Sequence, residues 1–414
     1  MGARRKTRWR MSLKIGITTN EFVAHGGVTM VVANMVEALQ HDHEVTVYTF
    51  KSSPIEAINE VFGGQLQPDR VRVELLPCCQ GLQRHVKPLR SYMLSRFCKR
   101  CPAPPDVWIS GDNEMDFGCS GIQYIHFPVA CAKTKVLRYL NMSQPRAAIS
   151  ALKRTLLAPI FQFRAEAMTR NITLTNSHWT AERIREAYGI RAAVLYPPIS
   201  DSRDELSEWH TRENGFVCVG RMSPDKNLEL VIRIVSRLRR RGHDVHLHIV
   251  GLSDAPGYVR YLRRRYQTEM AWLFIQPNVT RAELRTLLGT HRFGIHGKRN
   301  EHFGIVVGEM LESGVIPFIP DSGGQVEILR NVESLWYTSE DDAVDRIEAV
   351  LRGQGISRVQ GLLSKLRGQF SPARFQNQFR GIVQSFANAG HDANGVALPG
   401  PVKVTLPAGY FGGM

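Results

Sequence analysis

Short apolar runs alternate along the chain with longer stretches that have helical apolar spacing. Near its start, the pattern predicts a buried strand at Leu13–Thr18, a helix at Val28–Leu39 and a second strand at Glu44–Thr49. A strand, a glycine-containing turn, a helix and a second strand form a βαβ unit, which predicts a parallel sheet. Further strands are predicted at residues 72–76, 107–110, 121–126, 171–176 and 193–196.

A second series of the same kind follows Pro197–Pro198, which interrupts the first. Residues 199–214 (ISDSRDELSEWHTREN) are polar and charged, as expected of a linker. The pattern beyond them predicts strands at 216–219, 245–250, 273–276, 293–296 and 315–319, and helices at 227–240, 281–288 and 304–313. Both halves are therefore predicted to be doubly wound α/β domains.

The predicted organisation has six parts, each defined by its residue pattern. They are a disordered basic leader at 1–12, an N-terminal domain at 13–198, the linker at 199–214, a C-terminal domain at 215–370, a helix at 371–390 that could cross back to the first domain, and a flexible tail at 391–414 rich in Gly, Pro and Ala. Two such domains facing each other form a cleft, and open α/β sheets bind ligands at the carboxyl ends of their strands. Site residues are therefore expected in loops that follow strands.

The segment Glu301–Glu309 (EHFGIVVGE) carries two carboxylates eight positions apart. Because a helix is predicted to begin near Gly304, the backbone N–H groups of His302–Ile305 would be available to an anion. Glu309 could accept hydrogen bonds from a vicinal diol, and Glu301 from hydroxyls of a group attached to the phosphate. An amphipathic helix with a capping Glu is the alternative.

A second motif, Val219–Asn227 (VGRMSPDKN), places Arg221 and Lys226 between a predicted strand and a predicted helix. Both side chains could direct cationic donors at a diphosphate leaving group. The alternative is an ordinary charged turn in which Ser223 and Pro224 open the helix.

Weaker signals follow three other predicted strands. Gly26–Gly27 allows close backbone approach to a ligand or forms a simple turn, and the chain contains no full GxGxxG or Walker A sequence. His126 stands at a strand end, where it could face the cleft or be structural. Asp321–Gly324 could place N–H groups near a sugar or phosphate, or form a tight turn.

Together these motifs resemble the family 4 retaining glycosyltransferases of the GT-B architecture. Residues 216–329 carry the resemblance to their C-terminal domain, through GFVCVGRMSPDKNLELVI, IVG and NEHFGIVVGEMLESGVIPFIPDSGGQVEIL, with the EX7E spacing intact. The N-terminal half is similar more loosely, through Gly26–Gly27, QYIHFP and TLTNSHWTAERI. Residues 124–128, 176–180 and 301–305 are also similar to the group containing the GDP-mannose-dependent enzyme that extends lipid-linked oligosaccharides in the dolichol pathway.

The resemblance implies an α/β protein of GT-B fold, in which two Rossmann-like domains face a cleft. It implies that Arg221 and Lys226 bind the donor diphosphate, that Glu301 positions the donor sugar without acting as a covalent nucleophile, and that Glu309 binds the nucleotide ribose. The catalytic set would be completed by His126, near the donor sugar. Further donor contacts are implied for Gly26, Gly27, Val279, His302, Phe303, Gly304 and Ile305.

No metal ion and no cofactor is expected, because the two cations and the helix-start amides would stabilise the developing anion themselves. The nucleotide sugar, GDP- or UDP-linked, is a co-substrate. One departure from the family is His296–Asn300 (HGKRN), where a short Pro-Ser segment is often found. Its two extra cations could meet phosphate or acceptor.

The net charge of +15 indicates an anionic partner. Residues 75–165 carry thirteen Lys and Arg against four Asp and Glu, and the first ten residues add five cations, so the excess lies on the N-terminal side. The acid-free stretches 75–105 and 117–165 mix cations with apolar residues, as an interfacial membrane helix does. A solvated basic face over a packed helix is the alternative.

Composition narrows the function classes further. With 43% hydrophobic and 22% charged residues the chain is an ordinary globular one, and the absence of any run of eighteen apolar residues argues against a transmembrane helix. Seven Cys, too few for a disulfide scaffold, favour a cytoplasmic location.

We therefore predict a glycosyltransferase, peripheral on the cytoplasmic membrane face, that moves a hexosyl group, with mannosyl favoured, to a glycan or lipid-phosphate acceptor. The alternatives are an inactive sugar-nucleotide-binding scaffold, a GT-B phosphorylase or epimerase, and a basic nucleic-acid-binding protein. The last of these lacks any nucleic-acid motif.

Overall fold

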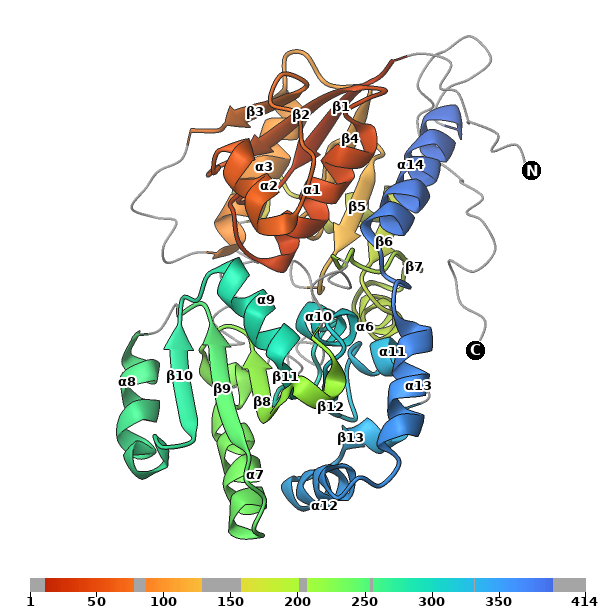
Figure 1. Ribbon diagram of the computed structural model, residues 1–414. Coiled ribbons are helices and arrows are strands. Elements are labelled where there is room, and N and C mark those ends of the chain that lie inside the picture. The colour runs from red at the N-terminus through yellow and green to blue at the C-terminus, as the bar shows by residue number, and fades with distance from the viewer. Residues whose placement is uncertain are drawn as a thin grey trace, which may run out of the picture. The chain divides into compact units, whose positions relative to one another are not determined.

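The computed structural model describes residues 12–77, 87–128, 158–200, 207–253, 256–330 and 332–389, and these form two compact units (Figure 1). The first unit comprises the chain up to Pro198 together with the segment from Pro372, and the second runs from Ile199 to Ser371. The last helix, α14 (Pro372–Ala389), therefore belongs to the first unit. Residues 1–11 of the predicted leader and all of the predicted tail lie outside the described residues.

The first unit is built on a parallel sheet with the strand order β3-β2-β1-β4-β5-β6-β7. Its strands are β1 (Lys14–Thr18), β2 (Glu44–Thr49), β3 (Val71–Leu75), β4 (Val107–Ser110), β5 (Ile122–Ile125), β6 (Ile172–Thr175) and β7 (Ala193–Val194). Beside α14, the helices among its described residues are α1 (Gly27–Leu39), α2 (Ile55–Phe62), α3 (Lys87–Arg100) and α6 (His178–Tyr188). The order reverses between β1 and β4, which is where a doubly wound sheet binds its ligand.

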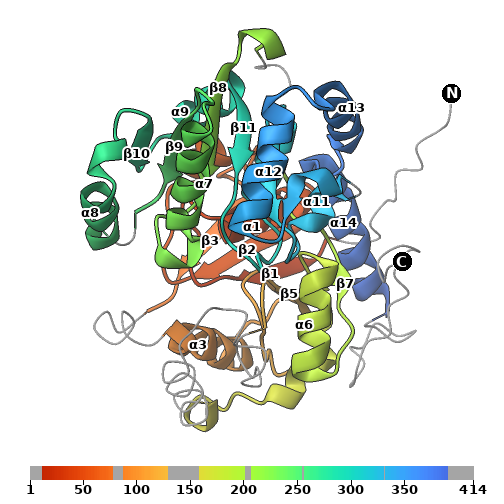
Figure 2. The same cartoon turned by 90° about the horizontal axis from the view of Figure 1, so that it is seen from below.

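Alternate strand residues point to opposite faces of this sheet, so each face has its own core. Ile15 and Val107 pack with α1, α2 and α14 on one face, to which α14 contributes Phe379. On the other face Trp108 packs with Leu94 of α3. Figure 2 shows α3 and α6 on the side of the sheet opposite α1.

The helix α3 lies in one of the two acid-free basic stretches. Its apolar side chains Leu89, Tyr92, Leu94 and Cys98 are buried inside the first unit. Most of the remaining apolar residues of the two stretches, at 78–86 and 129–157, lie outside the described residues, so the membrane-surface interpretation stays a prediction. In the part of the chain that the structure describes, no helix combines the length and hydropathy needed to cross a bilayer.

The second unit is built on a parallel sheet with the order β10-β9-β8-β11-β12-β13. Its strands are β8 (Glu213–Val219), β9 (His246–Gly251), β10 (Leu273–Pro277), β11 (His291–Ile295), β12 (Ile316–Pro320) and β13 (Trp336–Tyr337). Its helices are α7 (Leu228–Arg240), α8 (Pro256–Arg265), α9 (Arg281–Thr290), α10 (Ile305–Glu312), α11 (Val326–Leu329), α12 (Glu340–Leu351) and α13 (Ile356–Leu366). The apolar residues Val217 and Val219 of β8 pack with Leu284 and Leu288 of α9 and with Met310 of α10.

The predicted order of strands and helices is confirmed in both units, and most boundaries agree within three residues. One difference is that β8 begins at Glu213, inside the predicted linker, because Glu213 pairs with His291 of β11. The helices that were not predicted include α2, α6, α8, α12 and α13, and the strand β13 was not predicted either. The helix α12 begins with three acidic residues (Glu340–Asp342), and charged residues also stand between its later apolar positions. This weakens the apolar spacing that would predict a helix.

Candidate active site

The two strongest sequence motifs meet at the carboxyl end of the second sheet. Lys226 ends a short 3-10 turn (Pro224–Lys226) that follows β8, and Glu301 lies in the loop that follows β11. The Lys226 Nζ donates a hydrogen bond of 2.6 Å to Glu301 Oε2, although the two residues are 75 positions apart. Their side chains are only 15% and 13% exposed, so the ion pair is largely withdrawn from water.

Two further residues of the loop after β11 complete the surroundings of Glu301. The Nζ of Lys298 lies 3.8 Å from Glu301 Oε1, and the Nε2 of His296 lies 3.7 Å from Oε2. Burial alone would raise the pKa of the Glu301 carboxyl, but Lys226 and Lys298 together hold that pKa well below its ordinary value. Glu301 is therefore a carboxylate at neutral pH. Lys298 belongs to the segment that departs from the family pattern.

His296 responds to the same surroundings in the opposite way. Burial first, and then the charge of Lys226, lowers the pKa of His296 to about 4. The imidazole is therefore neutral at pH 7 and lies beside a carboxylate whose charge is already balanced by lysines. The backbone of His296 is held in turn by Tyr337, whose hydroxyl donates to the His296 carbonyl.

Arg221 lies on the open side of this charge cluster. Its side chain is 52% exposed, and Nη2 is 3.9 Å from Asp225 Oδ2, which also lies 3.4 Å from Lys298 Nζ. Asp225 also accepts a 2.6 Å hydrogen bond from the Ser223 hydroxyl. The guanidinium thus keeps a large exposed surface for an anionic ligand, while Asp225, which the sequence reasoning missed, links it to Lys298.

The backbone of Glu301 is held by the Asp321–Gly324 loop. The amide of Gly324 donates 2.7 Å to the Glu301 carbonyl, and Gly323 forms a bridge with Glu301. Gly323 has φ +88°, and a Cβ there would lie 2.5 Å from the Glu301 amide nitrogen. The loop therefore has a defined local role, which is to fix the position of Glu301.

The buried side chain of Gln325 ties the same two loops together. Its amide nitrogen donates to the carbonyls of Lys298 at 3.0 Å and Ser322 at 2.9 Å. Since Gln325 is fully buried, these bonds lie in a low-dielectric environment, and an unsatisfied group there would be costly. Sequence reasoning did not single out Gln325, which follows the predicted Gly-rich loop directly.

The helix α10 begins as predicted, directly after Gly304. Gly304 has φ +94°, a backbone conformation that favours glycine, and no side chain caps the start of this helix. The amides of the first turn, together with the positive end of the helix dipole, are therefore suited to an anion. His302 and Phe303 lead into this turn, and Ile305 is its first residue.

Glu309 lies one turn further along α10, where it pairs with a residue that the sequence reasoning missed. The Nη2 of Arg281 is 2.6 Å from Glu309 Oε1, with side-chain exposures of 24% and 11%. The carboxylate of Glu309 raises the pKa of Arg281. Arg281 is the first residue of α9, whose start is fixed by a capping box between Thr280 and Glu283. The apolar pattern also placed a helix start at residue 281, but neither signal pointed to a partner for Arg281.

Val279, which the resemblance implies as a donor contact, immediately precedes this cap. Its side chain is partly buried and packs on the apolar cluster that contains Val219 and Leu284. The structure therefore places Val279 just before α9, two residues ahead of Arg281.

In the first unit, His126 follows β5 and is held from several sides. Its backbone amide donates 2.9 Å to Asn113 Oδ1, and its Nε2 lies 3.0 Å from the Gly111 carbonyl. A carbonyl only accepts, so Nε2 carries the proton and Nδ1 the lone pair in the neutral ring. Burial lowers the pKa of His126, although Asp112 opposes this shift. Asn113 and Asp112 are further polar residues at this end of the sheet that sequence reasoning missed.

Gly26 and Gly27 form the start of α1, directly after the loop that follows β1. Gly26 has φ +85°, and α1 begins at Gly27 with neither a side-chain cap nor an acidic residue in its first turn. The exposed helix start is thus suited to an anion in the same way as that of α10. The structure brings Arg221, Lys226 and Glu301 together in the second unit, and it places His126 and Gly26–Gly27 in the first.

Comparison with known proteins gives this geometry a context. Residues 201–363 match the family model described as glycosyl transferases group 1. The Anabaena protein HepE, solved in complex with UDP-glucose, superposes with a TM-score of 0.62 and 12% identity, over 90% of this chain and all of that one. The fold is therefore GT-B, as predicted, and the family resemblance seen in the motifs is confirmed for the second unit.

Several curated relatives carry the name "GDP-Man:Man(3)GlcNAc(2)-PP-Dol alpha-1,2-mannosyltransferase". The one from Dictyostelium discoideum is 27% identical over 241 residues, which cover 52% of this chain and 48% of the relative. The one from Homo sapiens is 24% identical over 292 residues, which cover 63% of this chain and 58% of the relative. The chain thus spans about half the length of the curated relatives it matches.

Proposed function

We propose that this chain is a retaining glycosyltransferase that moves a mannosyl group from GDP-mannose to a lipid-linked oligosaccharide. The names of the relatives support the donor and the acceptor, and the GT-B fold supports the reaction class. The observation that carries the proposal is the buried Lys226–Glu301 pair beside Arg221, at the carboxyl ends of β8 and β11. Open α/β sheets bind their ligands at this end, outside the carboxyl ends of the strands.

The cations of this site match the charge that develops when a sugar–diphosphate bond breaks. Arg221 offers an exposed guanidinium, and the first turn of α10 offers backbone N–H groups. Lys226 would turn from Glu301 to the diphosphate when the donor binds. These groups would stabilise the leaving anion without a metal ion.

Glu301 would then meet the sugar. Lysines hold it ionised, so it accepts hydrogen bonds from sugar hydroxyls and offsets the positive charge that develops on the ring. Glu309, with one oxygen fixed by Arg281, would accept from the ribose diol. His126 and the α1 start at Gly27 remain donor-side predictions of the first unit. The excess of positive charge supports a peripheral location on an anionic cytoplasmic membrane face.

The test is turnover of a nucleotide-sugar panel by the full chain, with GDP-mannose, UDP-glucose and ADP-glucose and a lipid-linked oligosaccharide acceptor. We expect transfer from GDP-mannose, reduced by about 100-fold in Glu301→Gln with nucleotide binding retained. Glu309→Ala should instead weaken GDP binding. The matched control is Glu348→Gln, which removes a carboxylate of the α7–α12 surface of the same unit.

Three outcomes would contradict the proposal. If no nucleotide sugar binds, the glycosyltransferase assignment is wrong. If GDP-mannose binds but no acceptor is ever mannosylated, the chain is a binding scaffold. If Glu301→Gln transfers at the rate of the Glu348→Gln control, the site described above is not the reaction centre.

A further inference from the structure

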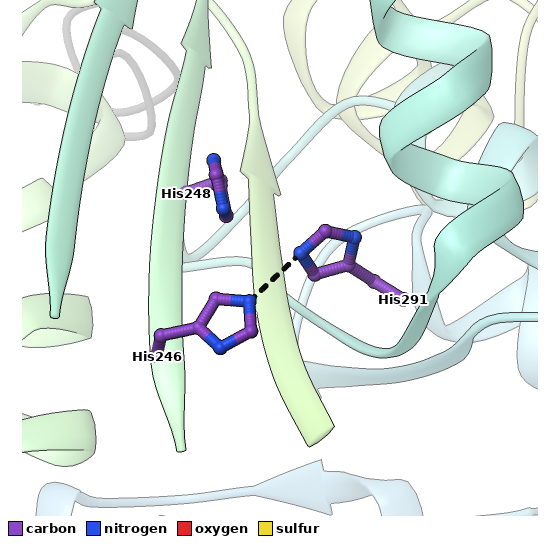
Figure 3. Close-up of side chains that lie close together, drawn as sticks. All are labelled: His246, His248 and His291. Atoms are coloured by element: carbon purple, nitrogen blue, oxygen red, sulfur yellow. Dashed lines mark hydrogen bonds between the residues drawn. The ribbon is translucent and has the colours of Figure 1, made fainter. Parts of the chain in front are cut away.

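Three histidines gather at the amino end of the second sheet, opposite the Lys226–Glu301 pair (Figure 3). His246 and His248 lie near the start of β9, and His291 is the first residue of β11. One potential ligand atom from each ring lies within 4.8 Å of the other two. The proposed transferase reaction uses none of these three side chains.

The strand register explains why the three rings meet. The strand β8 lies between β9 and β11, with Gly215 paired to His246 and Glu213 paired to His291. His248 is two residues beyond His246, so both point to the same face of the sheet. Gly215 has no side chain on that face, and a Cβ there would lie 2.5 Å from Cε1 of His246. The His246 ring can therefore pass over β8 until its Nε2 lies 3.0 Å from Nε2 of His291.

Hydrogen bonds fix the orientation of the two other rings. The Nδ1 of His291 lies 2.8 Å from the Leu287 carbonyl, and the Nδ1 of His248 lies 2.7 Å from Oε1 of Gln276. Both partners are acceptors, so Nδ1 carries the proton and Nε2 carries the lone pair in each neutral ring. This is the outer hydrogen bonding that metal-ligating histidines show in proteins.

The plane of the His248 ring is also fixed, because the ring stacks on Phe274 with ring centroids 4.6 Å apart. Glu213 adds an oxygen on the open side, with Oε2 3.4 Å from Nε2 of His246 and a side chain 57% exposed. Three imidazoles and one carboxylate thus converge from three adjacent strands. A simple ring-to-ring hydrogen bond involves only His246 and His291, whereas potential ligand atoms of all three rings lie within 4.8 Å of one another.

We propose that His246, His248 and His291 bind a divalent transition-metal ion, with Glu213 as the fourth ligand. Imidazole and carboxylate ligands in a four-coordinate set favour zinc. Tetrahedral zinc with nitrogens at about 2.1 Å places neighbouring ligand nitrogens roughly 3.4 Å apart, close to the 3.0 Å between His246 and His291. A closed four-ligand set is structural, so the ion would join β9, β8 and β11 at the end of the sheet away from the donor.

The first experiment measures Zn²⁺ binding by the full chain after chelation and dialysis, in competition with a chromophoric chelator. We expect one tight equivalent and a weakening of at least about 100-fold in the double variant His246→Gln/His248→Gln. The glutamines keep hydrogen-bonding capacity at both positions. His210→Gln, which changes an exposed histidine of the same unit, is the matched control and should bind as the parent does.

A second readout separates this site from zinc bound by cysteines and from a loss of folding. Co²⁺ in the site should give a d–d spectrum without thiolate charge-transfer absorption, and Zn²⁺ should raise the melting temperature of the parent but not of the double variant. Unfolding without metal checks that the double variant folds. The proposal is overturned if the folded double variant binds Zn²⁺ as tightly as the control, if the Co²⁺ spectrum is that of thiolates, or if the parent binds no ion.

Discussion

The two ends of the second sheet bury ionisable groups in opposite ways. At the carboxyl end, Glu301 is surrounded by Lys226 and Lys298 and stays charged, with its pKa well below the ordinary value. At the amino end, desolvation and the two neighbouring rings lower the pKa of His291 to about 4, so it stays neutral. The carboxyl end of the sheet therefore holds paired charges, and the amino end holds a neutral imidazole.

The difference shows that burial alone does not decide the charge of a side chain. Desolvation disfavours the charged form at both ends, but only Glu301 has cations close enough to outweigh it. Charges held in this way can bind a charged substrate, whereas neutral imidazoles offer lone pairs. The same fold element thus carries two kinds of chemistry, determined by the residues at each end of its strands.

The largest expected effect comes from removing the cation that keeps Glu301 charged. Lys226→Met should lower the rate of mannosyl transfer by about 10²–10³-fold. The variant lacks the ammonium group that would bind the diphosphate, and Glu301 loses its closest cationic partner. Single-turnover kinetics would measure this, and Lys365→Met, at an exposed lysine of α13, is the control. Equal transfer rates in the two variants would contradict the view that paired charges at the carboxyl end of the sheet serve the reaction.

The next effect concerns pH and the neutral histidine beside Glu301. The pKa of His296 is lowered to about 4, so the unfolded chain takes up a proton at higher pH than the folded one. Its contribution to stability is complete above pH 6.5 and decreases as the pH falls towards 4, by up to about 3 kcal/mol.

Denaturant unfolding between pH 8 and 4.5 would measure this dependence in the parent and in His296→Asn. His43, His126, His246 and His291 also have lowered pKa values, so the parent curve contains their contributions as well. We expect the variant to lose less stability over this range than the parent. A parallel pair of curves would show that His296 takes up a proton in the folded state as easily as in the unfolded one.

The smallest expected effect comes from disturbing the Asp321–Gly324 loop, which holds the backbone of Glu301. Gly323→Ala should cost about 2 kcal/mol of stability, since it combines a strained positive φ with a collision against the Glu301 backbone. Gly353→Ala is the matched control, because Gly353 has φ +81° with open space around it, and should cost about 1 kcal/mol. Transfer should fall about 10-fold in the first variant only. Identical stability and activity in both would mean that the loop does not position Glu301.

The motifs that could be predicted from sequence are local ones. Apolar periodicity predicted most strands of both sheets in their order along the chain, but not their order within each sheet, and the helix predicted at 304–313 placed Glu301 and Glu309 correctly relative to the start of α10. The residues that escaped prediction act through long-range pairing. Arg281 is recognisable only when α9 is placed against α10, and the histidine cluster only when the register of β8, β9 and β11 is known.

The return of α14 to the first unit has a consequence for the order in which the protein is made. Phe375, Phe379 and Phe386 of this helix complete the core that α1 and α2 begin, yet they are synthesised after the whole of the second unit. During translation, the second unit is contiguous and can fold as soon as it leaves the ribosome. The core of the first unit is completed only when α14 emerges, and until then the part of the apolar face that α14 covers stays exposed.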